Sequence, residues 1–185
     1  MMKSILYTDR LILRMLDDQD SAAVTRYIQD NRVSLAEWEP YRTEDYYSEL
    51  YQKEQLRQSI MMSYRGEMCK WWISRKDQPE RIIGSISLSN IARGAFQSCH
   101  LGYGLDGQER DQGFMTEALQ RVVEYAFGEL GLHRIEANIM PRNGASLKVV
   151  EKLGFYHEGL AYKYLKINGV WEDHIHMVLR NEEKE

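Results

Sequence analysis

The stretch between residues 105 and 116 carries the most informative chemistry of this sequence. It reads LDGQERDQGFMT, so an apolar strand-like run leads through a polar turn directly into a strongly amphipathic helical pattern. A helix that begins there presents free backbone N–H groups and the positive end of its dipole, which together suit a phosphate or pyrophosphate. Gly113 has no Cβ, so an anion can approach the backbone closely at that point. Taken alone, the pattern also fits an ordinary helix start that binds nothing.

A second group of residues, downstream of this loop, indicates what the loop binds. The run Pro141–Ser146 (PRNGAS) follows a strand-like segment, and Leu153-Gly154-Phe155 follows the next helical pattern. Together with Arg110–Met115 (RDQGFM), these residues resemble the Gcn5-related N-acetyltransferase (GNAT) superfamily, whose Arg/Gln-x-x-Gly-x-Gly/Ala loop cradles the pyrophosphate of coenzyme A. Met115 departs from the small residue that usually ends that loop. Because backbone amides do the binding, the departure leaves the resemblance intact.

Further motifs are similar to one branch of the superfamily, the RimJ-type ribosomal-protein-alanine N-acetyltransferases. They run from residue 8 to about residue 179 and comprise Thr8–Arg14 (TDRLILR), Leu35–Pro40 (LAEWEP), Asn90–Phe96 (NIARGAF) with Leu101-Gly102-Tyr103, and Asn168–Asp173 (NGVWED). The resemblance implies that acetyl-CoA is the co-substrate and that no metal takes part. It also implies direct acetyl transfer to the N-terminal alanine of a ribosomal protein, without a covalent enzyme intermediate.

The resemblance further implies where acetyl-CoA would lie. In the superfamily, the strand before the phosphate loop splays from the strand after its helix, and pantetheine lies between them; here these strands are residues 99–105 and 134–140. Free backbone groups there would pair with pantetheine as an added strand does, and nearby amides would stabilise the oxyanion. The residues expected to bind the cofactor are Leu101, Tyr103, Leu105, Arg110, Asp111, Gln112, Gly113, Phe114, Met115, Thr116, Asn143 and Ser146.

Two proton-transfer residues that are common among relatives are missing from this sequence. Asn138 stands where many relatives have a Glu base, and Val150 stands where many have a Tyr acid. Ser146 matches the serine that RimJ- and RimL-like enzymes present to the CoA sulfur, so we expect it to stabilise or protonate the departing thiolate. The competing interpretation of Ser146 is a hydroxyl that caps a helix.

Two glutamates are candidates for handling the proton of the acceptor amine. Glu136 shares a strand face with Asn138 by period-two spacing. Glu39 stands between Trp38 and Pro40, in the motif that lies beside the acceptor site in this branch, so Trp38, Glu39 and Asn138 are expected to contact the acceptor. An α-amine with a pKa of about 8 is partly neutral near pH 7, so a strong base is not essential. The alternative for each glutamate is a solvated surface charge, and Trp38 would equally fit the core.

The remaining histidines and cysteines favour structural roles. His174 and His176 share one strand face, but the sequence shows no third ligand, so no metal site is expected. We interpret His100 as a strand histidine whose hydrogen bonds are satisfied within the protein, in preference to a residue that contacts the substrate amine. Cys69 and Cys99 are too few for a disulfide framework and lack metal-ligand spacing, so we expect both to be buried as small hydrophobic residues.

Strands and helices alternate along the chain in the order that a mixed α/β sheet requires. Strands are predicted over residues 10–16, 69–74, 81–88, 99–105, 134–140, 162–167 and 171–179, with a turn at 76–80 and an Asn168-Gly169 hairpin. Helices are predicted after Asp17-Asp18 and over residues 44–65, 113–130 and 145–153. The tyrosines of residues 44–65 are expected to pack in the core in preference to lining a groove. The resemblance implies one GNAT domain over residues 1–185, with its sheet splayed between the fourth and fifth predicted strands and helices on both faces.

Composition narrows the range of partners. The 185 residues carry 24 Lys+Arg against 28 Asp+Glu, a net charge of −4, and this mild acidity argues against a nucleic-acid binder. The N-terminus reaches charged residues before an apolar run of signal-peptide length, and no stretch approaches the roughly 20 apolar residues of a membrane span. We therefore expect a cytoplasmic monomer or homodimer without membrane contacts. The acidic residues Glu37, Glu39, Glu44 and Asp45 would favour a basic ribosomal-protein tail as acceptor.

Two other functions stay open on the sequence. One is an acetyltransferase for a small amine, such as a polyamine, an amino sugar or an antibiotic. The other, motivated by the missing Glu and Tyr catalysts, is a non-catalytic acyl-CoA-binding or ribosome-assembly protein. Positioning and oxyanion stabilisation lower much of a reaction barrier by themselves, so we favour an enzyme.

Overall fold

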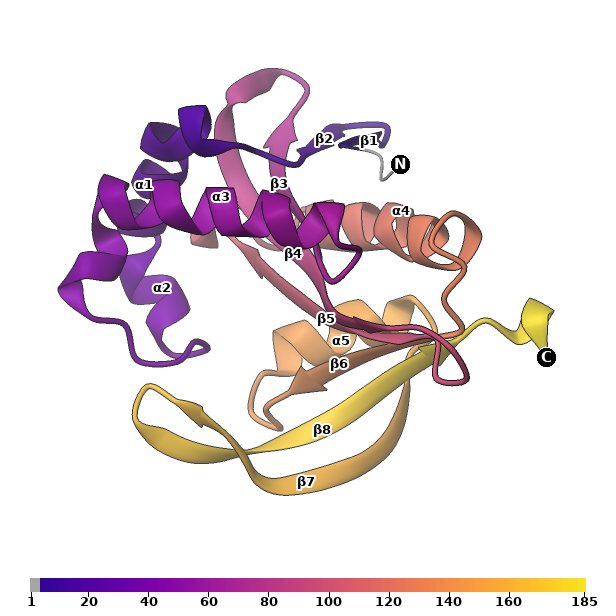
Figure 1. Ribbon diagram of the computed structural model, residues 1–185. Helices are drawn as coiled ribbons and strands as arrows, with labels where there is room; N and C mark the ends of the chain where they lie inside the picture. Colours follow the sequence, from indigo (N-terminus) through magenta and orange to yellow (C-terminus); the bar gives the residue numbers. More distant parts are fainter. Residues whose placement is uncertain (1–3) are drawn as a thin grey trace.

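An eight-stranded mixed sheet organises the computed structural model, which describes residues 4–185 (Figure 1). The spatial order of the strands is β1-β2-β3-β4-β5-β6-β8-β7. Their bounds are Ile5–Tyr7 (β1), Leu11–Arg14 (β2), Cys69–Arg75 (β3), Gln78–Ala92 (β4), Ser98–Leu105 (β5), Arg134–Ile139 (β6), Tyr156–Ile167 (β7) and Val170–Arg180 (β8). The α-helices are Ser21–Asp30 (α1), Arg32–Ala36 (α2), Glu49–Tyr64 (α3), Phe114–Gly128 (α4) and Gly144–Lys152 (α5), and 3-10 turns cover Asp18–Asp20, Glu44–Tyr47, Gly107–Glu109 and Glu182–Lys184.

Helices cover both faces of the sheet, as predicted. Figure 1 shows α1 and α3 on one side of β3 and β4 and α4 on the other. Strand β3 serves both faces because its side chains alternate: Trp71 and Ile73 join the core under α4, whereas Trp72 joins the smaller core under α1 and α3. Trp71 packs edge-on against Tyr125 of α4, with ring centroids 5.4 Å apart. Burial of these apolar faces fixes both helical layers on the sheet.

Strands β5 and β6 pair in parallel for only three residues and then separate. Ser98, Cys99 and His100 pair with Arg134, Ile135 and Glu136. Beyond that point Leu101–Leu105 pair with β4 alone, and Ala137–Ile139 pair with β8 alone. We call this separation the β5–β6 split and the His100–Glu136 pair its apex. The split is the predicted splay, because β5 and β6 are the fourth and fifth predicted strands.

Several element boundaries differ from the prediction. Residues 5–7 form an unpredicted strand, β1, that pairs with β2 as the first half of a hairpin. The predicted turn at 76–80 shrinks to residues 76–77, because β4 already begins at Gln78 and includes Pro79. Strand β7 begins at Tyr156 instead of residue 162, since β8 is long enough to pair with all of it. Helix α2 was not predicted.

The helix predicted over residues 44–65 is two elements. Ser48 has an extended backbone (φ −88°, ψ 148°) and its hydroxyl accepts the N–H of Tyr51 at 3.3 Å, so it caps α3 and separates it from the 3-10 turn before it. The apolar residues of α3 are less buried than their spacing indicates, since Leu50 is 80% exposed and Tyr64 is 86% exposed. Within residues 4–185, no helix has the length and apolar character that crossing a membrane requires.

Glu117 ties the β1–β2 hairpin to the first turn of α4. Its Oε1 accepts the Thr8 hydroxyl at 2.6 Å and the Arg10 backbone N–H at 2.8 Å, and its Oε2 accepts Arg10 Nε at 2.7 Å. Burial alone would raise the pKa of Glu117, but the bonds from Thr8 and Arg10 outweigh it and hold that pKa below the usual value. The carboxylate therefore stabilises the folded state wherever it is ionised.

We predict that Glu117→Gln lowers the free energy of unfolding by about 1 kcal/mol at pH 7. Because the folded pKa is lowered, this stabilisation is complete above the ordinary glutamate pKa of about 4.3 and is lost as pH falls through the folded value. Urea unfolding at pH 7 and near pH 3 measures the difference, with Glu124→Gln on the exposed side of α4 as control. A difference that is independent of pH would contradict the assignment to the charge.

Candidate active site

The loop between β5 and α4 concentrates backbone amides at the start of the helix. Asp111 (φ +62°) and Gly113 (φ +78°) both have left-handed backbone conformations, and Gly113 is the N-cap of α4. Left-handed residues that alternate with residues of ordinary conformation turn successive N–H groups toward one side and make an anion-binding concavity. The free amides in the first turn of the helix add further donors. The side chains of Phe114 and Met115 are buried in the core, so the large Met115 does not obstruct this surface.

Buried ion pairs hold this loop in place. Glu109 is 4% exposed; it accepts Arg81 at 2.6 Å and lies 3.5 Å from Arg75. Asp106 accepts a second nitrogen of Arg81 at 2.7 Å, and Arg10 donates to the carbonyl of Gln112 at 3.0 Å. Sequence analysis missed these residues, because partners from the β3–β4 hairpin and the β1–β2 turn have no fixed spacing to the loop. Arg110, by contrast, is exposed and forms no ion pair within the described residues.

The backbone groups on the open side of β5 belong to Leu101, Tyr103 and Leu105. The N–H of Asp106 points to β4, where it donates to Ile83 at 2.7 Å, and the carbonyl of Gln97 points to β6, where it accepts the N–H of Arg134 at 3.1 Å. Because backbone groups alternate along a strand, the odd-numbered residues between them face β6. Past the apex these groups have no strand to pair with.

The Tyr103 side chain reaches α5. The Ser146 hydroxyl donates to the Tyr103 oxygen at 2.6 Å, and the Tyr103 hydroxyl donates to the Ser146 carbonyl at 3.0 Å. Asn143, not Ser146, caps α5, since its side-chain oxygen accepts the N–H of Ser146 at 3.1 Å. The helix-cap interpretation of Ser146 is therefore wrong. Burial raises the pKa of Tyr103 to about 12, only partly offset by the bond from Ser146, so this phenol is protonated at neutral pH.

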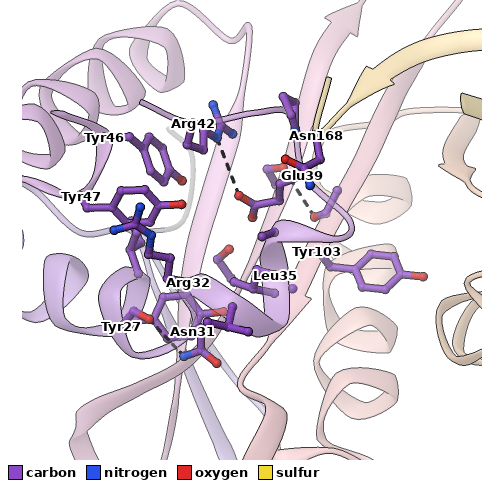
Figure 2. Close-up of a pocket in the computed structure, with 18 of the residues that line it drawn as sticks. Tyr27, Asn31, Arg32, Leu35, Glu39, Arg42, Tyr46, Tyr47, Tyr103 and Asn168 are labelled. Atoms are coloured by element: carbon purple, nitrogen blue, oxygen red, sulfur yellow. Dashed lines mark hydrogen bonds and ion pairs between the residues drawn. The ribbon is translucent and has the colours of Figure 1, made fainter. Parts of the chain in front are cut away.

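A cavity of about 570 Å³ lies on the opposite face of β5, beneath α1, α2 and the segment that follows α2 (Figure 2). We call it the α1–α2 cavity. Two cross-strand rows make its floor, Lys70–Ser87–Gly102 and Trp72–Ser85–Gly104. The side chains shrink from β3 to β5, so the floor has most room beside the split. A Cβ at Gly104 would stand 3.6 Å from Leu35 and 3.9 Å from the Tyr27 hydroxyl, inside this space.

Two polar groups of the cavity have no polar partner within residues 4–185. The buried Tyr27 hydroxyl makes no hydrogen bond, and burial with the nearby charges of Glu39 and Asp106 raises its pKa. The Lys70 ammonium makes no ion pair; it lies 4.5 Å from the ring centroid of Trp72, and burial lowers its pKa despite Glu39. Figure 2 shows the Tyr103 side chain pointing away from this cavity. Tyr46 and Tyr47 pack against the smaller core, as predicted, and also line this cavity.

Glu39 lines the α1–α2 cavity, as its motif predicts, but Trp38 does not. The Glu39 carboxylate lies 3.7 Å from Arg42, and its carbonyl accepts the N–H of Asn168 at 3.0 Å, so the β7–β8 hairpin closes on this segment. The Trp38 ring instead packs against the guanidinium of Arg142, whose carbon is 5.1 Å from the ring centroid. Trp38 therefore supports the wall of the α1–α2 cavity by packing on its outer side.

The predicted acidic patch is largely neutralised. Arg142 bonds Glu37 at 2.6 Å, Arg42 lies beside Glu39, and Arg32 bonds Glu44. The Arg32 bond holds the pKa of the exposed Glu44 below its usual value. An arginine faces each of these three carboxylates, which lowers the net negative charge of the patch. Recruitment of a basic tail by this patch stays a prediction.

Glu136 lies at the apex in a network of partners. It accepts His176 Nδ1 at 2.8 Å and pairs with Arg134 at 2.8 Å, and His100 Nε2 lies 3.7 Å away. Burial alone would raise the pKa of Glu136, but the bonds from His176 and Asn138 and the charge of Arg134 hold it below the usual value. The alternative of a solvated surface charge is wrong, because the Glu136 side chain is only 12% exposed and is ion-paired. A role of Glu136 in handling the proton of the amine stays a prediction.

The cysteines and the remaining histidines have the structural settings expected of them. Cys69 and Cys99 are buried and form no disulfide within residues 4–185, and burial raises the pKa of each thiol to about 12. His100 Nδ1 lies 3.1 Å from the Asn90 amide, and His174 is buried with Nδ1 3.0 Å from the Glu172 carbonyl. His176 is the exception, because its ring is only partly buried and faces Glu136.

Comparison with known proteins identifies the family. The model described as "Acetyltransferase (GNAT) domain" matches residues 10–156. The chain belongs to the GNAT acetyltransferase family. It is 39% identical to "Probable N-acetyltransferase YjcK" of Bacillus subtilis, a match that covers 95% of this chain and 96% of that protein. It is 37% identical to the [Ribosomal protein uS5]-alanine N-acetyltransferase of Escherichia coli, over 92% of this chain and 87% of that protein.

A solved structure agrees with this assignment. Mycobacterium smegmatis RimJ in complex with CoA-disulfide superposes with a TM-score of 0.90 at 27% identity, over 97% of this chain and 88% of that chain. The predicted GNAT fold and the predicted similarity to RimJ-type enzymes are confirmed. The chain is an N-acetyltransferase of this family, so the hypothesis of a non-catalytic binding protein is not retained.

Binding of the acceptor in the α1–α2 cavity can be tested by filling the space above its glycine floor. We predict that Gly104→Val raises KM for the acceptor by about tenfold or more and leaves CoA affinity within about twofold, because the methyls would enter the cavity and not the split. Steady-state kinetics and calorimetry with CoA measure the two effects. The control is Gly159→Val on β7, where a Cβ meets no atom within 4 Å. Equal losses for acceptor and CoA would exclude this cavity as the acceptor site.

Proposed function

We propose that this enzyme transfers the acetyl group of acetyl-CoA to the α-amine of a ribosomal protein that begins with alanine, by direct attack in a ternary complex. One observation carries the proposal: β5 has an unpaired backbone edge at the split and a glycine-floored cavity on one face, so two ligands can meet at residues 101–105. The similarity to a uS5-alanine N-acetyltransferase supports the choice of acceptor.

The split and the adjoining loop suit acetyl-CoA. Pantetheine would pair with the backbone of Leu101, Tyr103 and Leu105, and these amides would stabilise the oxyanion that forms when the amine attacks the thioester. Asn143 would reach the cofactor from the start of α5. The pyrophosphate would lie over the amides of Arg110, Asp111, Gln112, Gly113, Phe114, Met115 and Thr116, with the free Arg110 cation beside it. The similarity to M. smegmatis RimJ, solved in complex with CoA-disulfide, supports coenzyme A as the ligand.

Ser146 would supply the proton that the departing thiolate needs. Its hydroxyl lies on the first turn of α5, next to the split, and is held at 2.6 Å from Tyr103. When the C–S bond breaks, the Ser146 hydroxyl would turn its proton from Tyr103 to sulfur, and the protonated phenol of Tyr103 would turn its own proton from the Ser146 carbonyl to the serine oxygen. The buried Val150 has no group for this role, so the pair takes the place of the tyrosine common among relatives.

The acceptor would enter through the α1–α2 cavity, with its amine over Gly102 and Gly104. The unpartnered hydroxyl of Tyr27 can donate to the first carbonyl of a peptide, and Lys70 can do the same from β3. Glu39 on the wall would attract the ammonium group as it enters. Asn138 would contact the amine from the far side of the split.

A small-amine acceptor is the second candidate. The cavity volume of about 570 Å³ lies in the range of small-molecule sites, which are roughly 300–1,000 Å³. The arginine pairs of its wall do not form the anionic lining that a polyamine would need, and this observation favours the peptide.

The acceptor class is decided by comparing substrates on one preparation. We predict that kcat/KM for a peptide beginning with alanine, taken from uS5, exceeds that for any amine in a panel of polyamines, amino sugars and aminoglycosides by about tenfold or more. CoA release and peptide mass both report the reaction. The same peptide with an acetylated N-terminus is the control. A metabolite that is preferred over the peptide would refute the proposed acceptor.

The Ser146–Tyr103 pair is tested by a double-mutant cycle. We predict that Ser146→Ala and Tyr103→Phe each lower kcat by about tenfold or more, and that the double variant is little worse than either alone, because the two hydroxyls act as a unit. CoA affinity should change little in all three. Tyr162→Phe on the exposed surface of β7 is the control. Fully additive losses would show that the hydroxyls act independently.

A further inference from the structure

A cluster of polar side chains occupies the same sheet face as the α1–α2 cavity, at the apex of the split. Cys99 and Ile135 are buried in the core beneath α4, so their neighbours His100 and Glu136 face the opposite side. Gly102, the next residue on that face of β5, belongs to the cavity floor. The cluster therefore adjoins the place where an acceptor amine would meet the thioester.

His176 is held in this cluster with one ring nitrogen free. Its Nδ1 lies 2.8 Å from Glu136, and because an ionised carboxylate only accepts, Nδ1 carries the hydrogen. The lone pair is then on Nε2, which has no hydrogen-bond partner within residues 4–185. The ring of Tyr164 packs edge-on at 5.0 Å and fixes the plane of the imidazole, whose side chain keeps 24% of its surface exposed.

Asn138 adds a second hydrogen-bond acceptor that has no donor. It pairs directly with His176 across β6 and β8, which brings the two side chains to within about 5 Å at Cβ. The amide of Asn138 faces Glu136, and its Oδ1 is buried with no hydrogen bond. A buried acceptor without a partner is costly unless a ligand supplies the donor. A primary ammonium, with several N–H groups, satisfies Asn138 Oδ1 and His176 Nε2 together.

We propose that His176 is the general base of the acetyl transfer, with Glu136 as its positioning residue and Asn138 Oδ1 orienting the amine. This inference rests on the proposed function, because it needs an amine acceptor in the α1–α2 cavity. It replaces a glutamate base by an imidazole from the neighbouring strand, and histidine is the side chain that most often acts as a general base.

The step balances as follows. His176 Nε2 takes one proton from the ammonium and later releases it to solvent. The neutral nitrogen forms the C–N bond to the acetyl carbonyl carbon, the C–S bond breaks, and the electron pair leaves with sulfur. The second proton, lost from nitrogen as the amide forms, replaces the one that Ser146 gives to the thiolate. The net products are the amide, CoA thiol and one proton.

Other groups around His176 set the charge of its surroundings. Glu136 is the nearest anion, and Arg134 pairs with both Glu136 and Glu158. The titratable or charged groups that join this cluster from the neighbouring strands are His100 on β5, Arg134 and Glu136 on β6, Glu158 and Tyr164 on β7, and His174 on β8.

The test is the pH profile of His176→Gln with a peptide that begins with alanine. Wild-type kcat/KM should level off below the α-amine pKa of about 8. The variant should lose about tenfold at pH 7 and recover toward pH 9, because it can use only amine that is already neutral, which is about a tenth of the amine at pH 7. His157→Gln, exposed on β7, should match wild type. A loss that is equal at every pH, or no loss, would overturn the proposal.

Glu136→Gln separates positioning from catalysis. It should lower kcat by about tenfold and move the acid limb of the profile to lower pH, since the anion that favours protonated His176 is gone. An unmoved limb would contradict the pairing. CoA binding by calorimetry reports that each variant folds.

A readout without turnover completes the test. Nitrogen NMR of the protein with CoA and the peptide should show a perturbed His176 Nε2 and an unchanged His157; no perturbation would overturn the contact. Failure of the proposed acceptor is distinguishable, because wild-type enzyme would then be inactive on the peptide. The pH comparison would in that case be made with the panel amine that is acetylated. If wild type acetylates no amine, the proposal falls with the proposed function.

Discussion

The separation of β5 from β6 after three residue pairs is the constraint on which the rest of the site depends. Unpaired backbone groups inside a sheet are costly, so other contacts must keep the two strands apart. Strand β4 holds β5 and β8 holds β6, while Leu101, Ile135 and Ile139 are anchored in the core under α4. The amides left open are the ones that a thioester cofactor can use.

The two faces of β5 have separate tasks because side chains alternate along a strand. The odd-numbered Tyr103 reaches α5 and Ser146, whereas the even-numbered Gly102 and Gly104 leave room in the α1–α2 cavity. Contacts between distant segments fix the cavity wall. Arg142 bridges Glu37 and Glu172, with bonds of 2.6 Å and 3.0 Å, and so links the segment after α2 to β8.

The acid and base roles that we propose are spread over several elements of the fold. The hydroxyl pair of Ser146 and Tyr103 joins α5 to β5, and the His176–Glu136 pair joins β8 to β6. Each pair couples a partly exposed group to a partner that fixes its orientation. In this proposal, a GNAT chain can have Asn138 and Val150 where many relatives have catalytic residues, because neighbouring elements supply the acid and the base.

The sequence by itself determined the order of strands and helices and the amide-rich loop at 110–116, because local spacing and turn chemistry encode these features. Its motifs identified the family, and that resemblance implied the place of the splay. Only the tertiary structure decided the partners: Tyr103 for Ser146, Arg142 for Glu37, and His176 for Glu136. These pairs are between 40 and 105 positions apart, as their residue numbers show. Strand register and helix packing, which no local pattern fixes, bring them together.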